Sequence, residues 1–382
     1  MPYHFNDTHL ALRDAVRQMV DKEIRPIADE MDATDRFPAD LVPVFGDMGL
    51  LQILVPESYG GPGGDVISAC IAREEIARVS SACALLAGQS SIGLVLALLH
   101  FGTEEQRQYW LPLVAKGRTL GCVAITEPEA GSDVGSMRTR ARRDGDSYII
   151  DGQKCFITFG SVAHYALVFA RTSGDKGFQG LSCFLVDTKT PGFRVGRNDN
   201  KMGLNGVPNV ELFFENMRVP AENMIGEEGK GFIAAMRILD MNRPTIGAQS
   251  VGLAQGALDF ALAYASQRKQ FGRPVAQFQG LQWMMADMAM QIEAARTLVY
   301  ETAHRIDNGD FARLAEMSAM AKCFATDTAM KVTTDAVQLM GGAGYMKSSP
   351  VERMMRDAKI GQIYEGTNQI QRLVIARHLV EA

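Results

Sequence analysis

Hydrophobic and polar positions follow a helical period at both ends of the 382-residue chain and a strand-like period between them. From about residue 6 to 118, acidic or Ser/Thr residues begin helical runs and glycines end them. After Gly226–Gly231 the helical period returns and continues to the C-terminus. We therefore predict an α domain, a small β domain and a second α domain.

Short β-prone runs fall between residues 120 and 219: Gly121–Ile125, Ser147–Asp151, Lys154–Thr158, Tyr165–Arg171, Leu181–Val186 and Val210–Phe214. Two Asp-Gly pairs, Asp144-Gly145 and Asp151-Gly152, predict hairpin turns between neighbouring strands. These runs are too short and too closely spaced for helices, so we expect a compact sheet.

One apolar stripe in the C-terminal third steps by four and three residues, through Leu281, Met285, Met288, Ile292, Ala295 and Val299. This spacing predicts a long helix with the stripe in the core. Ser349, Pro350 and Glu352 predict a helix start with a capping box. The predicted fold class is α+β, with an N-terminal helical domain at 1–118, a β domain at 119–227 and a C-terminal four-helix bundle at 228–382.

Composition indicates a soluble globular protein, because 47% hydrophobic and 22% charged residues allow a large core. The net charge of −5 comes without a Lys/Arg-rich run, so we expect no binding to nucleic acid. Apolar runs such as Ile92–Leu99 are too short to span a bilayer. The N-terminal residues M-P-Y-H-F-N-D resemble neither a signal nor a transit peptide. We therefore expect a cytoplasmic, bacterial protein that does not bind membranes.

Cysteines and histidines give no metal or redox motif. The six cysteines are scattered without a C-x-x-C pair, and we expect them to be reduced and mostly buried. Glu301 and His304 have the E-x-x-H spacing of di-iron bundles, but the second pair that such sites need is missing. We expect no metal site.

The most informative local feature is the sequence Tyr364-Glu365-Gly366-Thr367, which interrupts a helical pattern. Helix-compatible sequence runs from Pro350 to Lys359 and resumes at Asn368, so the Glu365 carboxylate lies at a helix entrance. The first N–H groups of a helix have no intrahelical partner. A carboxylate base beside such donors suits proton abstraction next to a carbonyl. Taken alone, the segment also fits a Glu in a solvated loop.

Four blocks in order carry a family resemblance: A-I-T-E-P-E-A-G-S-D at 124–133, K-C-F-I-T-F-G at 154–160, R-K-Q-F-G-R-P-V-A-Q-F-Q at 268–279, and the stretch 338–377. The last contains Q-L-M-G-G-A-G-Y, P-V-E-R-M-M-R-D-A-K-I and I-Y-E-G-T-N-Q-I-Q-R. Over nearly the whole chain the sequence resembles the FAD-dependent acyl-CoA dehydrogenase family, most of all its short-chain and related branched or cyclic acyl members. The resemblance implies the same three-part fold, with flavin between the β domain and the bundle.

The resemblance also implies roles for individual residues. FAD contacts are expected at Thr126, Ser132, Phe156, Thr158, Arg268, Gln270, Phe271, Phe278, Gln279, Gln338, Gly341, Gly342, Thr367 and Gln369. Acyl-CoA contacts are expected at Ser132, Asp240, Arg243, Gly366 and Arg377. The residues from Arg268 onward in the third block would reach the FAD of a neighbouring subunit, which implies an obligatory dimer and, as usual in the family, a homotetramer. The glycines of 341–344 lack G-x-G-x-x-G spacing, so a Rossmann site is disfavoured.

By the same resemblance, Glu365 takes the α-proton of a CoA thioester while flavin N5 accepts the β-hydride, as in fatty acid β-oxidation. The product is a trans-2-enoyl-CoA, and the electrons pass to an electron-transferring flavoprotein. The Glu365 N–H and a flavin ribityl hydroxyl would stabilise the thioester oxygen. A related subgroup carries its base at the position of Asn242, whose amide cannot act as one.

Two features concern the acyl group and the flavin. A helix over Ala84–Leu99 is expected to back the acyl pocket, and Cys83 stands where a glutarate-type enzyme carries an Arg, which disfavours a dicarboxylic substrate. The family usually has Asn where this chain has Phe159.

Two other functions remain open at this point. An acyl-CoA oxidase would use the same Glu and flavin with oxygen as acceptor, but it is usually a longer chain with an extra helical domain. A non-catalytic flavin-binding member of the fold could dispense with Glu365, whereas here the Y-E-G-T sequence is intact.

Overall fold

The N-terminal part of the chain folds into helices whose starts are capped by polar side chains. The computed structural model describes residues 2–88, 91–174 and 177–381. Its first helices are α1 (Asp7–Met19), α2 (Ala28–Thr34), α3 (Leu41–Asp47), α4 (Val66–Ala77), α5 (Ser81–Leu86), α6 (Leu96–Phe101) and α7 (Glu104–Ala115). Asn6 accepts from the His9 N–H (2.8 Å) to start α1, and Asp65 accepts from the Ser68 N–H (2.7 Å) to start α4.

Helix α4 lies in the interior, and all of its residues are buried. It packs against α8 (Gly231–Gln267) at two glycines that leave no room for a side chain. A Cβ at Gly252 would lie 2.0 Å from the Glu74 carbonyl, and one at Gly256 would lie 2.0 Å from the Arg78 carbonyl. The two backbones are therefore in direct contact.

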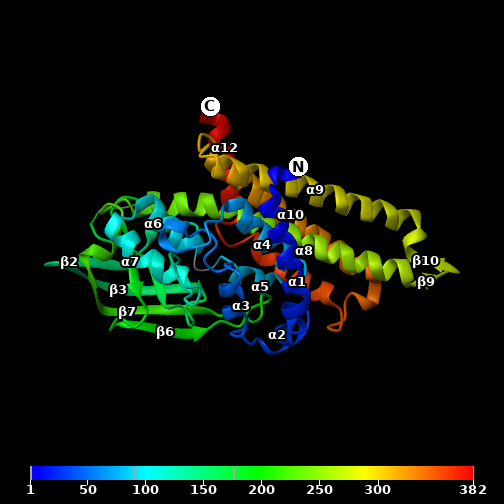
Figure 1. Cartoon of the computed structure of the whole chain (residues 1–382), viewed down its shortest axis with the longest axis horizontal. Helices are drawn as coiled ribbons and strands as arrows, with labels where there is room; N and C mark the ends of the chain where they lie inside the picture. The colour runs from blue at the N-terminus through cyan, green and yellow to red at the C-terminus, as the bar shows by residue number, and fades with distance from the viewer. Residues whose placement is uncertain (1, 89–90, 175–176, 382) are drawn as a thin grey trace.

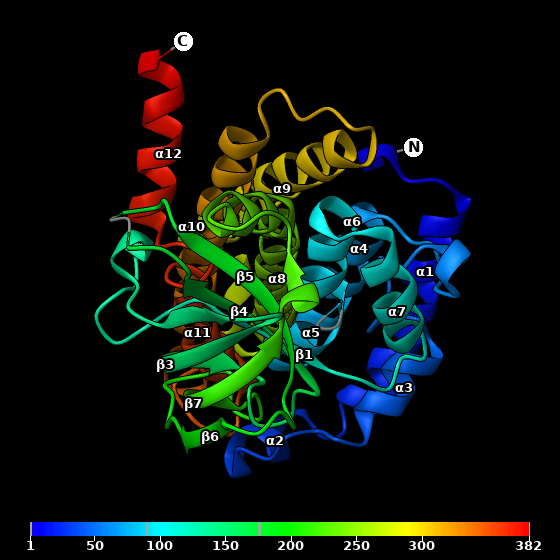
Figure 2. The same cartoon turned by 90° about the vertical axis from the view of Figure 1, so that its left-hand side faces the viewer.

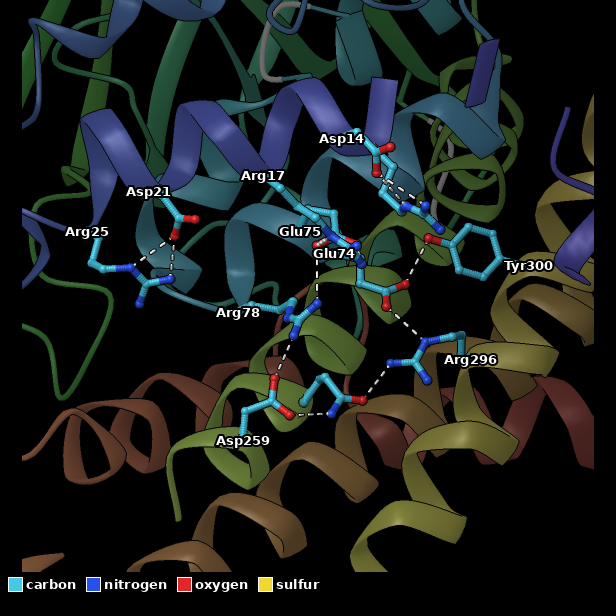
Figure 3. A network of polar contacts seen from close by, with 12 residues as sticks. Asp14, Arg17, Asp21, Arg25, Glu74, Glu75, Arg78, Asp259, Arg296 and Tyr300 are labelled. Carbon is cyan, nitrogen blue, oxygen red and sulfur yellow. Dashed lines mark hydrogen bonds and ion pairs between the residues drawn. The ribbon is translucent and has the colours of Figure 1, made fainter. Parts of the chain in front are cut away.

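Polar side chains also fasten α4 to its neighbours (Figure 3). Glu75 accepts two bonds from Arg17 of α1, both of 2.8 Å. Glu74 accepts from Arg296 (2.9 Å) and from the Tyr300 hydroxyl (2.8 Å), which both belong to α9 (Gln279–Asp307). The position of α4 is thus fixed from several sides.

The middle of the chain forms a mixed sheet with strand order β6-β7-β3-β2-β4-β5-β8, in which β1 pairs in parallel with β4. The strands are β1 (Gly121–Ala124), β2 (Arg140–Asp144), β3 (Ser147–Thr158), β4 (Tyr165–Arg171), β5 (Leu181–Asp187), β6 (Phe193–Asn198), β7 (Asn209–Pro220) and β8 (Met224–Ile225). Figure 2 shows this sheet beside the N-terminal helices.

One of the two predicted hairpin turns is wrong. Asp144-Gly145 does join β2 to β3, but Asp151-Gly152 lies inside β3, which runs through both predicted strands without a turn. Gly152 has a φ of 156° at a register shift, and a Cβ there would lie 2.5 Å from Thr139 Oγ1. The glycine therefore serves a bulge and a close contact instead of a turn.

The C-terminal part is a helical bundle with three long helices, α8 (Gly231–Gln267), α9 (Gln279–Asp307) and α10 (Leu314–Met340), followed by α11 (Pro350–Gly361) and α12 (Asn368–Glu381). A small hairpin, β9 (Lys269–Gln270) and β10 (Arg273–Pro274), joins α8 to α9 at the end remote from the sheet (Figure 1). The helical, β and helical parts occur in the predicted order, so the predicted fold class is confirmed. The boundaries at 118/119 and 227/228 stay a prediction.

The C-terminal helical predictions are confirmed in part. The apolar stripe lies on α9, where Met288, Ile292, Ala295 and Val299 are buried, while Leu281 and Met285 are only partly covered. The predicted capping box at Ser349 is absent, because Glu352 accepts from Arg356 instead (2.8 Å).

The predicted helix over Ala84–Leu99 is also wrong. Helix α5 ends at Leu86, and Gly88 has a left-handed φ of 73° that a continuing helix does not allow. Residues 89 and 90 lie outside the described residues, and helical structure resumes at Ser91–Val95 and α6.

Buried contacts also place two residues that the sequence singled out. Phe159 is 1% exposed with a φ of 62°, and its ring meets Phe37 edge-on at 6.2 Å, so it joins the sheet to the N-terminal helices. Cys83 is buried against Met31, and desolvation raises the pKa of its thiol to about 11. All six cysteines are buried and unpaired.

None of the helices within the described ranges combines the length and apolar character of a bilayer span.

Candidate active site

Glu365 lies in a tight elbow between α11 and α12. Its φ is 57°, a left-handed conformation that side-chain-bearing residues rarely adopt, and Gly366 follows with a φ of 89°. A Cβ at Gly366 would lie 2.6 Å from Gln371 Nε2. Glycine is therefore required directly after the carboxylate.

Cations and amides hold the backbone of this elbow. Arg243 Nε (3.3 Å) and Gln371 Nε2 (3.2 Å) both donate to the Glu365 carbonyl. Lys322 Nζ, from the middle of α10, donates to the Gly366 carbonyl and to Asn368 Oδ1, each at 2.8 Å. These bonds keep the unusual backbone in place.

The two oxygens of the Glu365 carboxylate differ. Asn242 Nδ2 of α8 donates to Oε1 (2.9 Å), whereas Oε2 is buried and has no hydrogen-bond partner among the described residues. An oxygen that is buried and unpartnered is ready to accept a proton.

Burial raises the pKa of Glu365 above the ordinary carboxyl value, against the opposing effect of Arg243, Arg73 and Lys322 nearby. The same desolvation lowers the pKa of Lys322 to about 8, although Glu365 acts in the other direction. A carboxyl group whose pKa is raised by burial and whose neighbours are buried cations is typical of a catalytic site.

Asp240 and Arg243, predicted to contact substrate, lie one helical turn apart on either side of Asn242 in the sequence and form an ion pair. The side chains are 14% and 4% exposed, so this is a buried pair. Burial raises the pKa of Asp240, and Arg243 opposes that shift. Arg377 is exposed further along α12, so Asp240, Arg243 and Gly366 meet at the elbow and Arg377 does not.

Three predicted flavin residues gather on the sheet. The Cys155 N–H donates to the Thr126 carbonyl (3.0 Å), which joins the end of β1 to β3 beside Phe156. Phe156 has a φ of 58°, and its ring is 67% exposed. Thr158 Oγ1 receives only a long bond of 3.5 Å from Asn209. Ser132 lies in the exposed loop after β1.

Thr367 and Gln369 follow Glu365 closely in the chain. Thr367 Oγ1 accepts from the Ile370 N–H (3.3 Å), and the Thr367 carbonyl accepts from the Gln371 N–H (2.9 Å). The Asn368 N–H donates to the Gln362 carbonyl (3.0 Å). Several N–H groups at the start of α12 are therefore already used, in contrast to the expectation that they are available to a ligand.

The remaining predicted flavin residues lie at the far end of the bundle: Arg268, Gln270, Phe271, Phe278, Gln279, Gln338, Gly341 and Gly342. Contacts of Gly247 with Ala321 and of Gly361 with both Ser250 and Thr326 show that α8 and α10 run in parallel. Arg268 is about 39 Å along α8 from Asn242, and Gln338 is about 24 Å along α10 from Lys322. One copy of the chain does not bring these residues to Glu365.

Both groups of residues fit a flavin. A Cβ at Gly341 or Gly342 would meet no atom within 4 Å, so the backbone there is open to a bound group. Phe271 is 94% exposed at the tip of the β9–β10 connection. At the elbow, Phe156 offers an uncovered aromatic face and Thr158 a weakly bonded hydroxyl. Among the described residues, no cluster of three His, Cys, Asp or Glu side chains is suited to a metal.

Sequence reasoning missed Arg73, Thr245, Lys322 and Gln371. Arg73 and Lys322 are 3% and 0% exposed within long helices. In the sequence they resemble ordinary charged positions on a helix, and only the fold brings them to Glu365.

Comparisons with known proteins agree along the whole chain. Models of the acyl-CoA dehydrogenase N-terminal, middle and C-terminal domains match residues 6–118, 122–217 and 229–380. A probable acyl-CoA dehydrogenase of Mycobacterium tuberculosis is 49% identical over 374 residues, which are 98% of this chain and 96% of the relative.

Solved structures have the same fold. Butyryl-CoA dehydrogenase from Megasphaera elsdenii is 40% identical with a TM-score of 0.96, and 100% of each chain is covered. A chain solved in work on the electron transferring flavoprotein of Acidaminococcus fermentans is 42% identical with a TM-score of 0.96, again over 100% of each chain.

The fold is also found in an oxidase. The prolyl acyl carrier protein oxidase AnaB is 30% identical with a TM-score of 0.93, covering 98% of this chain and 99% of that chain. Chain length therefore does not separate dehydrogenases from oxidases. The three family models and the full-length relatives together show that the chain belongs to the acyl-CoA dehydrogenase family of FAD-dependent flavoenzymes.

Proposed function

We propose that the protein oxidises a short-chain acyl-CoA to the trans-2-enoyl-CoA, with Glu365 as the base that removes the α-proton. The observation that carries this proposal is the carboxylate itself, in which Oε1 is held by Asn242 and Oε2 is buried and unpartnered among the described residues. The strained backbone at Glu365 supports it, because such strain is concentrated at functional sites.

The surroundings of Glu365 suit a base that works near neutral pH. Burial raises its pKa, and an apolar acyl chain would remove further water from the carboxylate. Arg243, Arg73 and Lys322 limit the rise and keep the carboxylate form available.

We assign the Glu365 N–H as a donor to the thioester oxygen. It has no acceptor among the described residues, whereas the N–H groups of Asn368, Ile370 and Gln371 have partners. A donor already in position stabilises developing negative charge by about 3 to 4 kcal/mol.

FAD supplies the hydride acceptor when it is bound. Thr126, Phe156 and Thr158 would hold its ring system beside Glu365, with Ser132, Thr367 and Gln369 around it. The Arg268 to Gln279 segment, Gln338, Gly341 and Gly342 of a neighbouring copy would hold the remainder. Exposed apolar side chains on α9 and α12, including Trp283, Met290 and Leu379, support assembly into a homotetramer.

The choice of a short acyl chain and of an electron-transferring flavoprotein as acceptor draws on the relatives. The Megasphaera elsdenii enzyme is a butyryl-CoA dehydrogenase, and the Acidaminococcus fermentans chain comes from work on an electron transferring flavoprotein. We also propose a cytoplasmic location.

The test is anaerobic bleaching of the bound flavin by acyl-CoAs of increasing length, in the wild-type protein and in Glu365→Gln. We expect butyryl-CoA to bleach the wild type and the variant to be slower by roughly 100-fold or more with FAD still bound. Equal rates would reject Glu365 as the base. Rapid peroxide formation in air, without stimulation by an electron-transferring flavoprotein, would favour an oxidase.

A further inference from the structure

A chain of hydrogen bonds runs from the interior helix α4 to the carboxylate of Glu365. Arg73 Nη1 donates to Thr245 Oγ1 (3.1 Å), and Arg73 Nε donates to the Ala87 carbonyl (3.1 Å). Thr245 Oγ1 lies 2.8 Å from Asn242 Oδ1 and 2.9 Å from the Asn242 carbonyl. Asn242 Nδ2 completes the chain at Glu365 Oε1 (2.9 Å).

The guanidinium of Arg73 sets the direction of these bonds. Because it has donors and no acceptor, Thr245 must accept from it, and the single hydroxyl proton of Thr245 is directed toward Asn242. Oδ1 of Asn242 shares that proton with the Asn242 carbonyl, and the contact with Oδ1 leaves the amide nitrogen facing Glu365. The opposite orientation would place two oxygens, Asn242 Oδ1 and the carboxylate, against each other.

Arg73 is itself held in place. It belongs to α4, whose backbone is pressed against Gly252 and Gly256 of α8. The neighbouring Glu74 and Glu75 bind α9 and α1 (Figure 3). Arg73, Thr245 and Asn242 are 3%, 1% and 7% exposed, so water does not compete for these bonds.

We propose that Arg73 and Thr245 are positioning residues, which act through Asn242 to present its N–H group to Glu365 and so hold the base in its carboxylate form. This inference rests on the proposed role of Glu365. Neither Arg73 nor Thr245 donates a hydrogen bond to the carboxylate. Thr245 therefore acts through the Asn242 amide alone, whereas Arg73 also lowers the pKa of Glu365 directly by its charge.

Other charged groups also face Glu365. They are Arg243 from α8 and Lys322 from α10, with Tyr364 next to it in the chain, while Asp240 pairs with Arg243. Thr245→Val leaves all of them in place and keeps the volume of the side chain, whereas changing Arg73 also removes a cation. Thr245 is therefore the sharper test.

The experiment follows protonation of Glu365 in the substrate-free holoenzyme by infrared spectroscopy, from the carboxylic acid C=O band that disappears in Glu365→Gln. Thr245→Val should weaken the hydrogen bond from Asn242 to the charged carboxylate, and the proton affinity of Glu365 should therefore rise about tenfold. The protonation midpoint of Glu365 should shift up by about one pH unit. The pH profile of flavin bleaching should shift in the same direction. Thr245→Ser keeps the hydroxyl and should restore the wild-type midpoint.

Two controls separate this role from simple packing. Thr333→Val removes another buried hydroxyl, which bonds only to backbone carbonyls of α10, and should leave the midpoint unchanged. In an Asn242→Leu background, Thr245→Val should add no further shift, because its effect passes through the missing amide.

An unchanged midpoint in Thr245→Val, or an equal shift in the Asn242→Leu background, would overturn the inference. Failure of the proposed function is a different result, in which Glu365→Gln bleaches at the wild-type rate whatever the titration shows.

Discussion

Lys322 Nζ lies 2.8 Å from the backbone carbonyl of Gly366, so a fully buried ammonium group on α10 holds the residue that follows Glu365. The same nitrogen donates to Asn368 Oδ1, at the start of α12. One side chain thereby ties both sides of the elbow to the bundle.

Lys322→Met should therefore loosen the elbow, because two buried acceptors lose their donor. Each unsatisfied group costs about 1 to 3 kcal/mol, so thermal unfolding should move to lower temperature and flavin bleaching should slow. Lys331→Met on the same helix removes an exposed lysine paired with Asp335 and should change neither. Equal melting temperatures for the two variants would contradict the anchoring role.

Glu365→Gln should be more stable than the wild type at neutral pH. Because the pKa of Glu365 is raised in the folded state, ionising it favours the unfolded chain, where the ordinary value near 4.5 applies. The wild type should lose stability relative to the variant as the pH rises from about 4.5 through the raised pKa, and the difference should then stay constant. Thermal or urea unfolding of both proteins between pH 4 and pH 8 measures it. A difference that grows toward acid pH would mean that the sign is wrong.

Gly252→Ala should destabilise the protein and slow flavin bleaching together. The added methyl group would lie 2.0 Å from the Glu74 carbonyl and must push α4, and with it Arg73, away from α8. Overpacking of this kind typically costs about 1 to 3 kcal/mol. Gly280→Ala makes the same change in α9 with no atom within 4 Å and should be neutral or slightly stabilising. Similar melting curves for the two variants would argue against the close contact.

Arg268→Ala should weaken FAD retention and subunit association at the same time. Arg268 is exposed at the end of α8, far from the Glu365 of its own chain, so its proposed contact is with the cofactor of a neighbouring copy. Sedimentation and flavin absorbance during dilution measure both effects. Arg142→Ala, at an exposed position on β2, serves as the control. If the variant keeps full flavin occupancy and the same oligomeric state, Arg268 is only a surface charge and does not contact the cofactor.

Helix-breaking residues and apolar runs explain how much of the fold was predictable from the sequence. Proline at position 350 and the interruption at 364–367 located α11, the elbow and α12, and apolar runs located β4 and β5. Strands β2 (R-A-R-R-D) and β6 (F-R-V-G-R-N) were missed because charged, exposed residues hide the strand pattern. Gly152 was misread because an Asp-Gly pair looks the same in a bulge as in a turn.

The candidate active site was predictable from the sequence only for residues that belong to a short motif. Glu365 stands in a short motif with its own helix interruption, whereas Arg73, Thr245 and Lys322 reach it from separate helices. No local pattern distinguishes a buried arginine that donates to a neighbouring helix from an arginine on a solvated helix face. The sequence also does not show that the predicted flavin residues lie at two ends of the bundle. That separation follows from the parallel course of α8 and α10, which only the fold reveals.

The glycine contacts of α4 on α8 also bear on how the site responds to heat and pressure. Side chains between two helices can change rotamer and let the gap widen, but backbone atoms in direct contact have no such freedom. The distance between Arg73 and Thr245 should therefore increase little on warming and decrease little under hydrostatic pressure. We expect the protonation midpoint of Glu365 to be less sensitive to hydrostatic pressure in the wild-type protein than in Gly252→Ala.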